Sequence, residues 1–277
     1  MTTPTWTSDD PPKPMPLGFG GTLRALFRGI VLAVVVFGGL IVLLLARLVE
    51  RPLFGMHRPW TPWITVFVCR AALRVLGLRV HHTGQPMQDK GLMVANHSSW
   101  LDIFALNSAG PLYFVSKSEV AQWPGIGWLA RATGTIFVQR QRSAAQEQTR
   151  IFEERLRAGH QLLFFPEGTS SDGLRVLPFK PTLFAAAFSP MLPGLSVQPV
   201  TVVYHAPEGR EPRHYGWWGD MEFGPHLVQM LGTARHGRVE VIWHDALKVD
   251  NFENRKAISA ASEAAVRGHH PSGSVGL

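Results

Sequence analysis

Hydrophobic residues fall into two kinds of stretch along this chain, one long and unbroken near the amino terminus and several short ones beyond residue 78. The long stretch, Gly29 to Ala46, contains eighteen uncharged residues. As a helix it would cover about 27 Å, nearly the thickness of the hydrocarbon layer of a bilayer. The short stretches alternate with segments of helical spacing, which is typical of an α/β domain. We therefore predict an α/β fold with a mostly parallel sheet flanked by helices, preceded by a membrane helix or a helical pair.

The short apolar runs have the length of strands, and the segments between several of them have the spacing of helices. Strands are predicted at 79–82, 91–95, 112–116, 135–138, 161–165, 197–204 and 239–243. Helices are predicted at 101–107, 143–158, 182–188 and 255–266.

A second apolar segment, residues 60–78, differs from the first. Trp60 and Trp63 stand where interfacial aromatic residues belong, and Arg70 and Arg74 interrupt the apolar surface one turn apart. We predict that this segment lies in the membrane interface or re-enters the bilayer. The alternative is that it forms an ordinary first helix of the soluble domain.

These stretches divide the chain into four parts. Residues 1–20, rich in Pro, Thr, Asp and Gly, are predicted to be a disordered lead, and residues 268–277 a frayed tail. Residues 21–78 form the membrane anchor, with an apolar helix at 29–46 and an interfacial helix at 60–78. Residues 79–267 form one catalytic domain. The alternative for 29–46 is a cleaved signal peptide, but no small-x-small cleavage site follows the segment.

The charge of the chain narrows the class of partner. A net charge of +7 implies an anionic partner, which is a membrane surface, a phosphate group or nucleic acid. Nucleic acid is not expected, because the Lys and Arg residues are scattered and no zinc-finger spacing or basic helix is present. A single cysteine, Cys69, excludes an intrachain disulfide and a Cys-based zinc site. No metal and no cofactor are predicted.

The strand predicted at 91–95 ends abruptly in a run of polar residues that can carry chemistry. His97 lies on the turn that follows this strand, and Asp102 lies at the start of the next helix. A carboxylate that fixes the tautomer of an imidazole allows that imidazole to take a proton from an alcohol. The spacing alone would be structural more often than catalytic, so its weight depends on the neighbouring strands.

Two further strands deliver polar groups at their carboxyl ends, where open α/β sheets bind ligands. The strand at 135–138 is followed by Arg140 and Arg142, whose guanidinium groups suit a phosphate or carboxylate. Pairing with a helix-surface glutamate, such as Glu153 or Glu154, is the alternative. The strand at 161–165 runs into Pro-Glu-Gly-Thr-Ser-Ser at 166–171, a polar loop that can offer backbone N–H groups to an oxyanion.

In these residues the chain resembles the bacterial 1-acylglycerol-3-phosphate acyltransferase family of membrane-bound glycerolipid acyltransferases. Four blocks match in order and together cover about residues 78–205. They are Asn-His-Ser-Ser-Trp-Leu-Asp at 96–102, Phe-Val-Gln-Arg at 137–140, Phe-Pro-Glu-Gly-Thr-Ser at 165–170 and Val-Gln-Pro-Val at 197–200. A run at 217–223 also looks like one found in a branch that includes lyso-ornithine-lipid enzymes.

The resemblance implies a role for each matching residue. His97 would be the general base and Asp102 its orienting partner, Arg140 would bind the phosphate of the acceptor, and Glu167, Gly168 and Thr169 would complete the acceptor site. Lys117 and Lys180 match basic positions that are often found there.

The implied reaction is transfer of an acyl group from acyl-CoA or acyl-carrier protein to a lysophospholipid. Lysophosphatidic acid is the first expected acceptor and lyso-ornithine lipid the second. The hydroxyl would attack the thioester directly, rather than an acyl group carried by Ser98 or Ser99, because the chain lacks a Gly-x-Ser-x-Gly elbow. A membrane-anchored lipid-binding protein is the non-enzymatic alternative.

The expected donors place the catalytic domain on the cytoplasmic side of a bacterial inner membrane, against an anionic lipid surface. One helix crossing from a cytoplasmic amino terminus would put the domain on the wrong side. A helical pair keeps both chain ends in the cytoplasm, and Gly38 and Gly39 would let its first helix bend or pack closely. A single span with an external amino terminus is the competing prediction.

Overall fold

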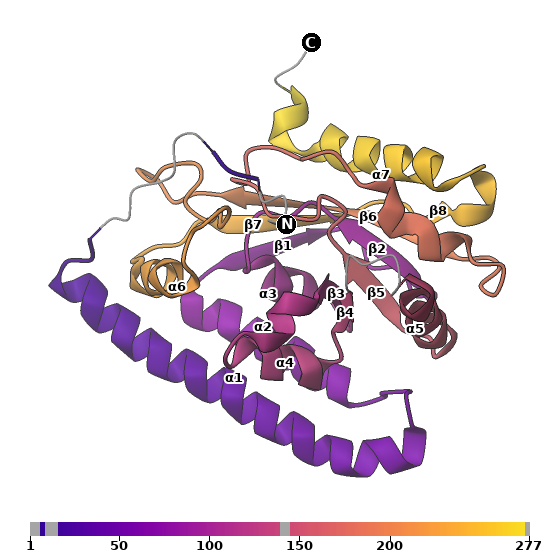
Figure 1. Ribbon diagram of the computed structural model, residues 1–277. Helices are drawn as coiled ribbons and strands as arrows, with labels where there is room; N and C mark the ends of the chain where they lie inside the picture. Colours follow the sequence, from indigo (N-terminus) through magenta and orange to yellow (C-terminus); the bar gives the residue numbers. More distant parts are fainter. Residues whose placement is uncertain (1–5, 9–15, 139–144, 275–277) are drawn as a thin grey trace.

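The computed structural model describes residues 6–8, 16–138 and 145–274, which form a layered α/β structure with a long helix along one side (Figure 1). Its α-helices are α1 (Phe19–Phe54), α2 (Thr61–Leu76), α3 (Asp102–Asn107), α4 (Ile126–Thr133), α5 (Ala145–Arg157), α6 (Phe223–Gly232) and α7 (Arg255–His269). Its strands are β1 (Arg79–Thr83), β2 (Gly91–Ala95), β3 (Tyr113–Lys117), β4 (Ile136–Val138), β5 (Gln161–Phe164), β6 (Ser196–His205), β7 (Arg238–Trp243) and β8 (Leu247–Lys248). Short 3-10 helices cover Ser118–Gln122, Pro181–Phe188, Val249–Asn251 and Pro271–Ser274.

One eight-stranded sheet has the order β1-β7-β6-β2-β5-β3-β4, with β8 paired to β6. The pairs β1–β7, β2–β6, β2–β5, β3–β5 and β3–β4 are parallel, and only β6–β7 and β6–β8 among these described pairs are antiparallel. The predicted α/β class and mostly parallel sheet are therefore confirmed. All five residues of β2 are buried, as expected for a strand covered on both faces.

The sheet separates two hydrophobic cores. Side chains alternate between them along β2, so that Met93 and Ala95 enter the core formed with α1, α2, α3 and α6. Leu92 and Val94 enter the core formed with α5, the 3-10 helix at 181–188 and α7. Figure 1 shows α7 and the α1–α2 pair on opposite sides of the sheet.

Helix α1 is twice as long as the apolar stretch that predicted it, because both of its ends pack on the protein. Near its start, Arg24 donates to Gly232 O at 2.8 Å and Arg28 donates to Thr233 O at 2.7 Å, at the carboxyl end of α6. Near its end, buried Glu50 accepts hydrogen bonds from the backbone N–H groups of Trp60 and Thr61, which begin the return of the chain. Within the described residues, α1 is the one helix long and apolar enough to cross a membrane.

Helix α2 lies against α1 and also against α3, so it joins the anchor to the sheet domain. Val66, Cys69 and Leu73 are buried on its inner face, whereas Trp63 and Phe67 are exposed on its outer face. The inner face therefore packs as the first helix of the soluble domain would, and contact of the outer face with the membrane interface stays a prediction. The two helices approach each other closely at Gly39, where an added Cβ would lie 2.3 Å from Val68 Cγ2.

Several local features differ from the sequence-based predictions. Helices α4 and α6 and strand β8 were not predicted, and residues 181–188 form a 3-10 helix rather than an α-helix. Part of the segment predicted to be disordered packs on the domain, since the Trp6 ring lies 6.0 Å from that of Trp218. In the predicted tail, α7 continues to His269, and His270 is buried, with its Nδ1 2.8 Å from Ser272 Oγ.

Candidate active site

The carboxyl ends of β2, β5, β3 and β4 meet at one edge of the sheet, because these neighbouring strands are parallel. His97 follows β2, Glu167 follows β5, and Lys117 ends β3. Arg140 follows β4 in the sequence but lies outside the described residues. The edge predicted to bind ligands thus gathers the described candidate residues from three separate strands.

His97 and Asp102 are in direct contact. The turn at residues 98–101 lets α3 begin at Asp102, whose carboxylate faces back toward the end of β2. His97 Nδ1 lies 2.7 Å from Asp102 Oδ2, which also accepts the backbone N–H groups of Ser98 at 2.9 Å and Ser99 at 3.1 Å. A carboxylate on Nδ1 keeps the proton on that nitrogen, so Nε2 carries the lone pair that can take a substrate proton.

His97 and Asp102 differ in their exposure to solvent. Asp102 is fully buried, whereas the His97 side chain is 21 % exposed. The imidazole stacks on Phe165, with ring centres 4.0 Å apart and planes at 13°. A buried, multiply bonded acid and a partly open base are the arrangement that proton transfer to and from a bound substrate requires.

Glu167 faces His97 from the loop after β5. Its Oε1 accepts the backbone N–H of His97 at 2.9 Å, and its Oε2 accepts that of Leu177 at 3.2 Å. Burial raises the pKa of Glu167 to about 8, although the two backbone donors and Arg267 oppose this effect. The carboxyl group therefore ties the β5 loop to the turn at residues 97–101 through the backbone.

The remaining predicted residues lie on the same loop or close to it in the fold. Gly168 has φ of +71°, a left-handed conformation that glycine adopts at little cost. Thr169 Oγ1 accepts the backbone N–H of Trp6 at 3.5 Å, so the amino-terminal segment contacts this loop. Lys180 donates its backbone N–H to Pro166 O at 2.9 Å, which places its backbone beside the start of the loop.

The alternatives for these residues are less well supported by the geometry. Ser98 Oγ is buried and has no hydrogen-bond partner among the described residues, so it is not bonded to an activating base. Ser99 Oγ accepts the backbone N–H of Leu101 at 3.4 Å. The glutamates weighed as partners for an arginine after β4 already have other partners, since Glu153 binds Ser189 and Glu154 binds Arg150.

Two residues that hold this site were not singled out in the sequence. Asn96 forms a pair of hydrogen bonds with Val202, its Nδ2 donating to the carbonyl at 2.8 Å and its Oδ1 accepting the N–H at 2.7 Å. The Tyr204 hydroxyl donates to Asp102 Oδ1 at 2.8 Å. No role was predicted for either residue, because Val202 is 106 residues from Asn96 and Asp102 is 102 residues from Tyr204.

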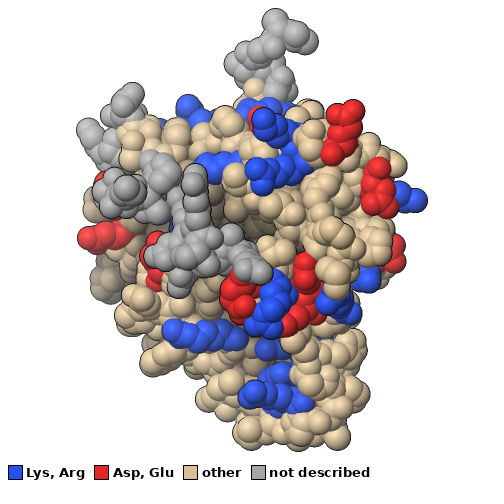
Figure 2. Space-filling model, turned by 45° about the vertical axis from the view of Figure 1, so that its right-hand side comes forward, with Lys and Arg blue, Asp and Glu red and all other residues tan. Residues whose placement is uncertain are grey.

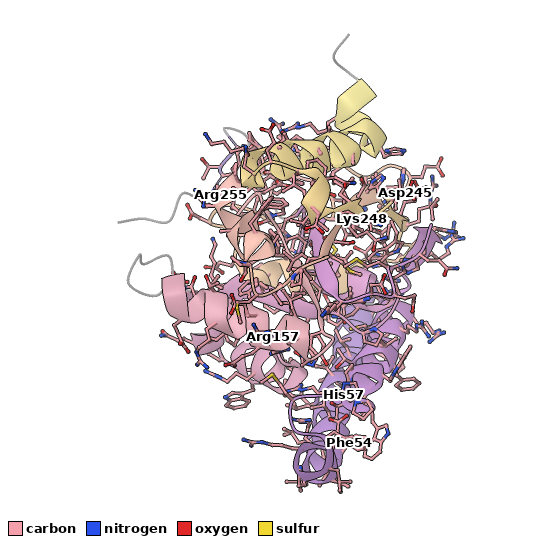
Figure 3. All side chains as sticks on the ribbon, turned by 90° about the vertical axis from the view of Figure 1, so that its right-hand side faces the viewer. Phe54, His57, Arg157, Asp245, Lys248 and Arg255 are labelled. Carbon is pink, nitrogen blue, oxygen red and sulfur yellow. The ribbon has the colours of Figure 1, made fainter. Side chains whose placement is uncertain are left out.

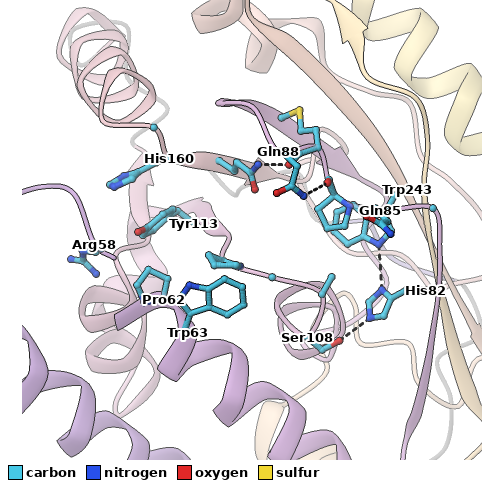
Figure 4. Close-up of a pocket in the computed structure, with 18 of the residues that line it drawn as sticks. Arg58, Pro62, Trp63, His82, Gln85, Gln88, Ser108, Tyr113, His160 and Trp243 are labelled. Atoms are coloured by element: carbon cyan, nitrogen blue, oxygen red, sulfur yellow. Dashed lines mark hydrogen bonds between the residues drawn. The ribbon is translucent and has the colours of Figure 1, made fainter. Parts of the chain in front are cut away.

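A pocket of about 580 Å³ lies at the opposite, amino-terminal edge of the sheet (Figure 4). Arg58 lines it from the connection between α1 and α2, and Trp63 lines it from α2. Tyr113 and His160 line it at the starts of β3 and β5, and His82 lines it from β1. It contains none of the candidate catalytic or acceptor-binding residues. The pocket therefore lies apart from the edge of the sheet that carries His97.

Basic side chains are spread over the surface and do not form a single stripe. In Figure 2 they alternate with acidic side chains around a central hollow. Arg157, Lys248 and Arg255 are exposed on three different elements (Figure 3). Among the residues at 6–8, 16–138 and 145–274, no group of three or more His, Cys, Asp or Glu side chains could hold a metal ion.

The chain is similar to known proteins over nearly its whole length. A family model described as Acyltransferase matches residues 77–230. A lyso-ornithine lipid O-acyltransferase from Rhodobacter capsulatus is 55% identical over 268 residues, covering 96% of this chain and 97% of that protein. A 1-acyl-sn-glycerol-3-phosphate acyltransferase from Neisseria gonorrhoeae is 36% identical over 136 residues, covering 49% of this chain and 52% of that protein.

A solved structure has the same fold. The 1-acyl-sn-glycerophosphate (LPA) acyltransferase from Thermotoga maritima superposes with a TM-score of 0.66, covering 93% of this chain and 96% of that chain at 22% identity. The likeness includes the amino-terminal helices as well as the sheet domain, because it extends over so much of both chains.

Proposed function

Since the chain belongs to the acyltransferase family, we propose that it transfers a fatty acyl group from an acyl thioester to the hydroxyl of lyso-ornithine lipid. The observation that carries the choice of acceptor is the 55% identity to a lyso-ornithine lipid O-acyltransferase over 96% of this chain. This reverses the order expected from the sequence motifs alone, which put lysophosphatidic acid first. Acyl-CoA and acyl-carrier protein are both thioesters that suit the reaction.

The His97–Asp102 contact supports direct attack by the acceptor. His97 Nε2 takes the hydroxyl proton as the oxygen forms its bond to the thioester carbonyl carbon. The imidazolium is stabilised by Asp102, 2.7 Å from Nδ1. The C–S bond then breaks, and the departing sulfur takes the proton from the imidazolium. No acyl group is attached to the protein at any stage, in keeping with the unactivated Ser98 hydroxyl.

The acceptor headgroup would lie along the carboxyl edge of the sheet. We assign its anionic group to Arg140, with Lys117 and Lys180 as further basic contacts, since a guanidinium or ammonium group pairs with a carboxylate or a phosphate. Gly168 and Thr169 would border the same group from the β5 loop. Glu167 would act through the backbone of His97, to which it is bonded at 2.9 Å.

Lysophosphatidic acid is the second candidate acceptor, favoured by the 36% identity to a 1-acyl-sn-glycerol-3-phosphate acyltransferase over 49% of this chain. The test is an assay of the purified full-length protein with labelled acyl-CoA and acyl-carrier protein against a panel of lysolipids. Highest kcat/KM with lyso-ornithine lipid is expected. Highest kcat/KM with lysophosphatidic acid would overturn the choice of acceptor. No acyl product with any pair would favour the lipid-binding alternative.

We place the protein in a bacterial inner membrane, with the catalytic domain on the cytoplasmic side against anionic lipid. The exposed apolar surface of α1 and the net charge of +7 support this location. Cysteine replacements at Thr5 and Ser274, made after Cys69→Ser, can be labelled with an impermeant reagent in intact spheroplasts. We expect labelling at neither site for a helical pair. Labelling at Thr5 alone would indicate a single span, and labelling at Ser274 would overturn the cytoplasmic location.

A further inference from the structure

Asp102 is held at both of its carboxylate oxygens, from two different parts of the fold. Oδ2 accepts His97 Nδ1 and two backbone N–H groups, all from the turn on which His97 lies. Oδ1 accepts the hydroxyl of Tyr204 at 2.8 Å, across a sequence distance of 102 residues. The second oxygen is thus bound by a residue outside the motif.

Tyr204 reaches Asp102 from a rigid neighbouring strand. It lies near the end of β6, which pairs in parallel with β2, the strand that leads into His97. Its ring is buried and lies 5.3 Å from that of Tyr215. The Tyr215 hydroxyl is itself fixed, because it accepts the N–H of Gly237 at 2.8 Å. The Tyr204 hydroxyl therefore has a fixed position relative to the catalytic turn.

Such a contact has two physical consequences for His97. A carboxylate held at both oxygens cannot rotate, so Oδ2 stays on Nδ1 and Nε2 keeps its direction. A donor on Oδ1 also draws negative charge away from Oδ2, which tempers the stabilisation of the imidazolium. Burial and the neighbouring Asp102 raise the pKa of Tyr204 well above its usual value, so the hydroxyl keeps its proton and remains a donor.

We propose that Tyr204 is a positioning residue of the catalytic array, which sets the orientation and basicity of His97 by binding Asp102 Oδ1. This inference rests on the proposed role of His97 as the general base. Tyr204 touches neither substrate in this arrangement, so its effect should fall on turnover and its pH dependence rather than on substrate binding.

The test compares Tyr204→Phe with Tyr215→Phe. The two variants each remove one buried hydroxyl from the same cluster, but Tyr215 does not contact Asp102. In Tyr204→Phe we expect kcat to fall about tenfold, the effect of losing one hydrogen bond to a charged group, with both KM values unchanged. The acidic limb of its pH–rate profile should move to higher pH, because Oδ2 then carries more of the charge. Tyr215→Phe should change neither kcat nor the position of the acidic limb.

A second measurement does not depend on turnover. The imidazole of His97 can be followed by NMR with labelled histidine, assigned by comparison with His97→Gln, and its titration midpoint should rise in Tyr204→Phe only. An unshifted midpoint together with an unchanged pH profile would overturn the role of Tyr204, even if thermal stability falls. Absence of acyl transfer by the wild-type protein would instead overturn the proposed function, and the NMR titration would still decide the role of Tyr204.

Discussion

The turn at residues 97–102 and helix α1 are held in place by opposite kinds of interaction. At the turn, Asp102 is fully buried and accepts four hydrogen bonds, each from a donor in a fixed direction. Along α1 the most apolar segment is only 6% buried, and residues such as Val34, which is 68% exposed, have no apolar protein surface over them. Directional contacts specify the turn, whereas α1 requires an apolar environment that the protein does not supply.

This contrast leads us to expect that substitutions at the turn act on turnover without detaching the protein from lipid. His97→Ala should lower kcat at least 100-fold, because a general base typically contributes 10²- to 10⁴-fold. The same assay with labelled acyl-CoA and the preferred lysolipid measures the loss. His81→Ala, which removes an exposed histidine from β1, is the matched control and should leave kcat unchanged. Retention of most of the wild-type rate by His97→Ala would remove the proposed mechanism.

Substitutions on the outer face of α1 should have the converse effect. Val34→Glu places a carboxylate within the apolar stretch at residues 29–46, which costs up to about 2.5–3.5 kcal/mol if that stretch lies in a bilayer. We expect most of the protein to leave the membrane fraction while kcat in detergent micelles stays near the wild-type value.

Thr22→Glu is the control for this prediction, because it adds the same charge to an exposed position of α1 outside the stretch. It should sediment with membranes like the wild type. If Val34→Glu remained with the membrane as completely as Thr22→Glu, α1 would not lie in hydrocarbon.

The comparison also explains what the sequence could and could not predict. Strands β1 to β7 and the contact of His97 with Asp102 depend on local patterns, an apolar run followed by a turn. The bounds of these strands were predicted within a residue or two, whereas the two-residue strand β8 was not predicted. Tyr204 could not be predicted, because its partner is 102 residues away and only the pairing of β6 with β2 brings them together.

The missed helices have a related cause. Helix α4 has only eight residues and contains Gly127, which would be unfavourable in an isolated helix. In the fold that glycine is needed, since an added Cβ would lie 2.2 Å from Ala121 O. Close packing thus decides the structure where local preference points elsewhere. The same limit applies to α1, whose full length depends on contacts of Arg24 and Arg28 with α6.

The buried carboxyl group of Glu167, which is bonded to the backbone of His97, should make the stability of the protein depend on pH. Its pKa is raised from the model-compound value of 4.5 to about 8, mainly by burial. A carboxyl group with a raised folded-state pKa contributes stability that is fully present below pH 4.5 and is lost as pH rises through about 8.

The Tm of the wild type, taken relative to Glu167→Gln, should therefore decline between pH 5 and pH 8. Glu119→Gln, which alters an exposed glutamate, should show no such trend relative to the wild type. A constant difference between wild type and Glu167→Gln over this range would mean that the buried carboxyl group does not take up a proton on folding.

The smallest expected effect distinguishes two adjacent glycines on α1. Gly38 has open space where a Cβ would stand, so Gly38→Ala should gain about 1 kcal/mol of helix stability, equivalent to a rise in Tm of about 2–4 °C.

At Gly39 an added Cβ would lie 2.3 Å from Val68 Cγ2. That methyl group cannot swing aside cheaply, because valine in a helix keeps one χ1 rotamer. Gly39→Ala should therefore lower Tm, and the double variant Gly39→Ala/Val68→Ala should recover part of the loss, since it removes the opposing methyl. Equal Tm changes for the two single variants in detergent would show that α1 and α2 do not pack at this point.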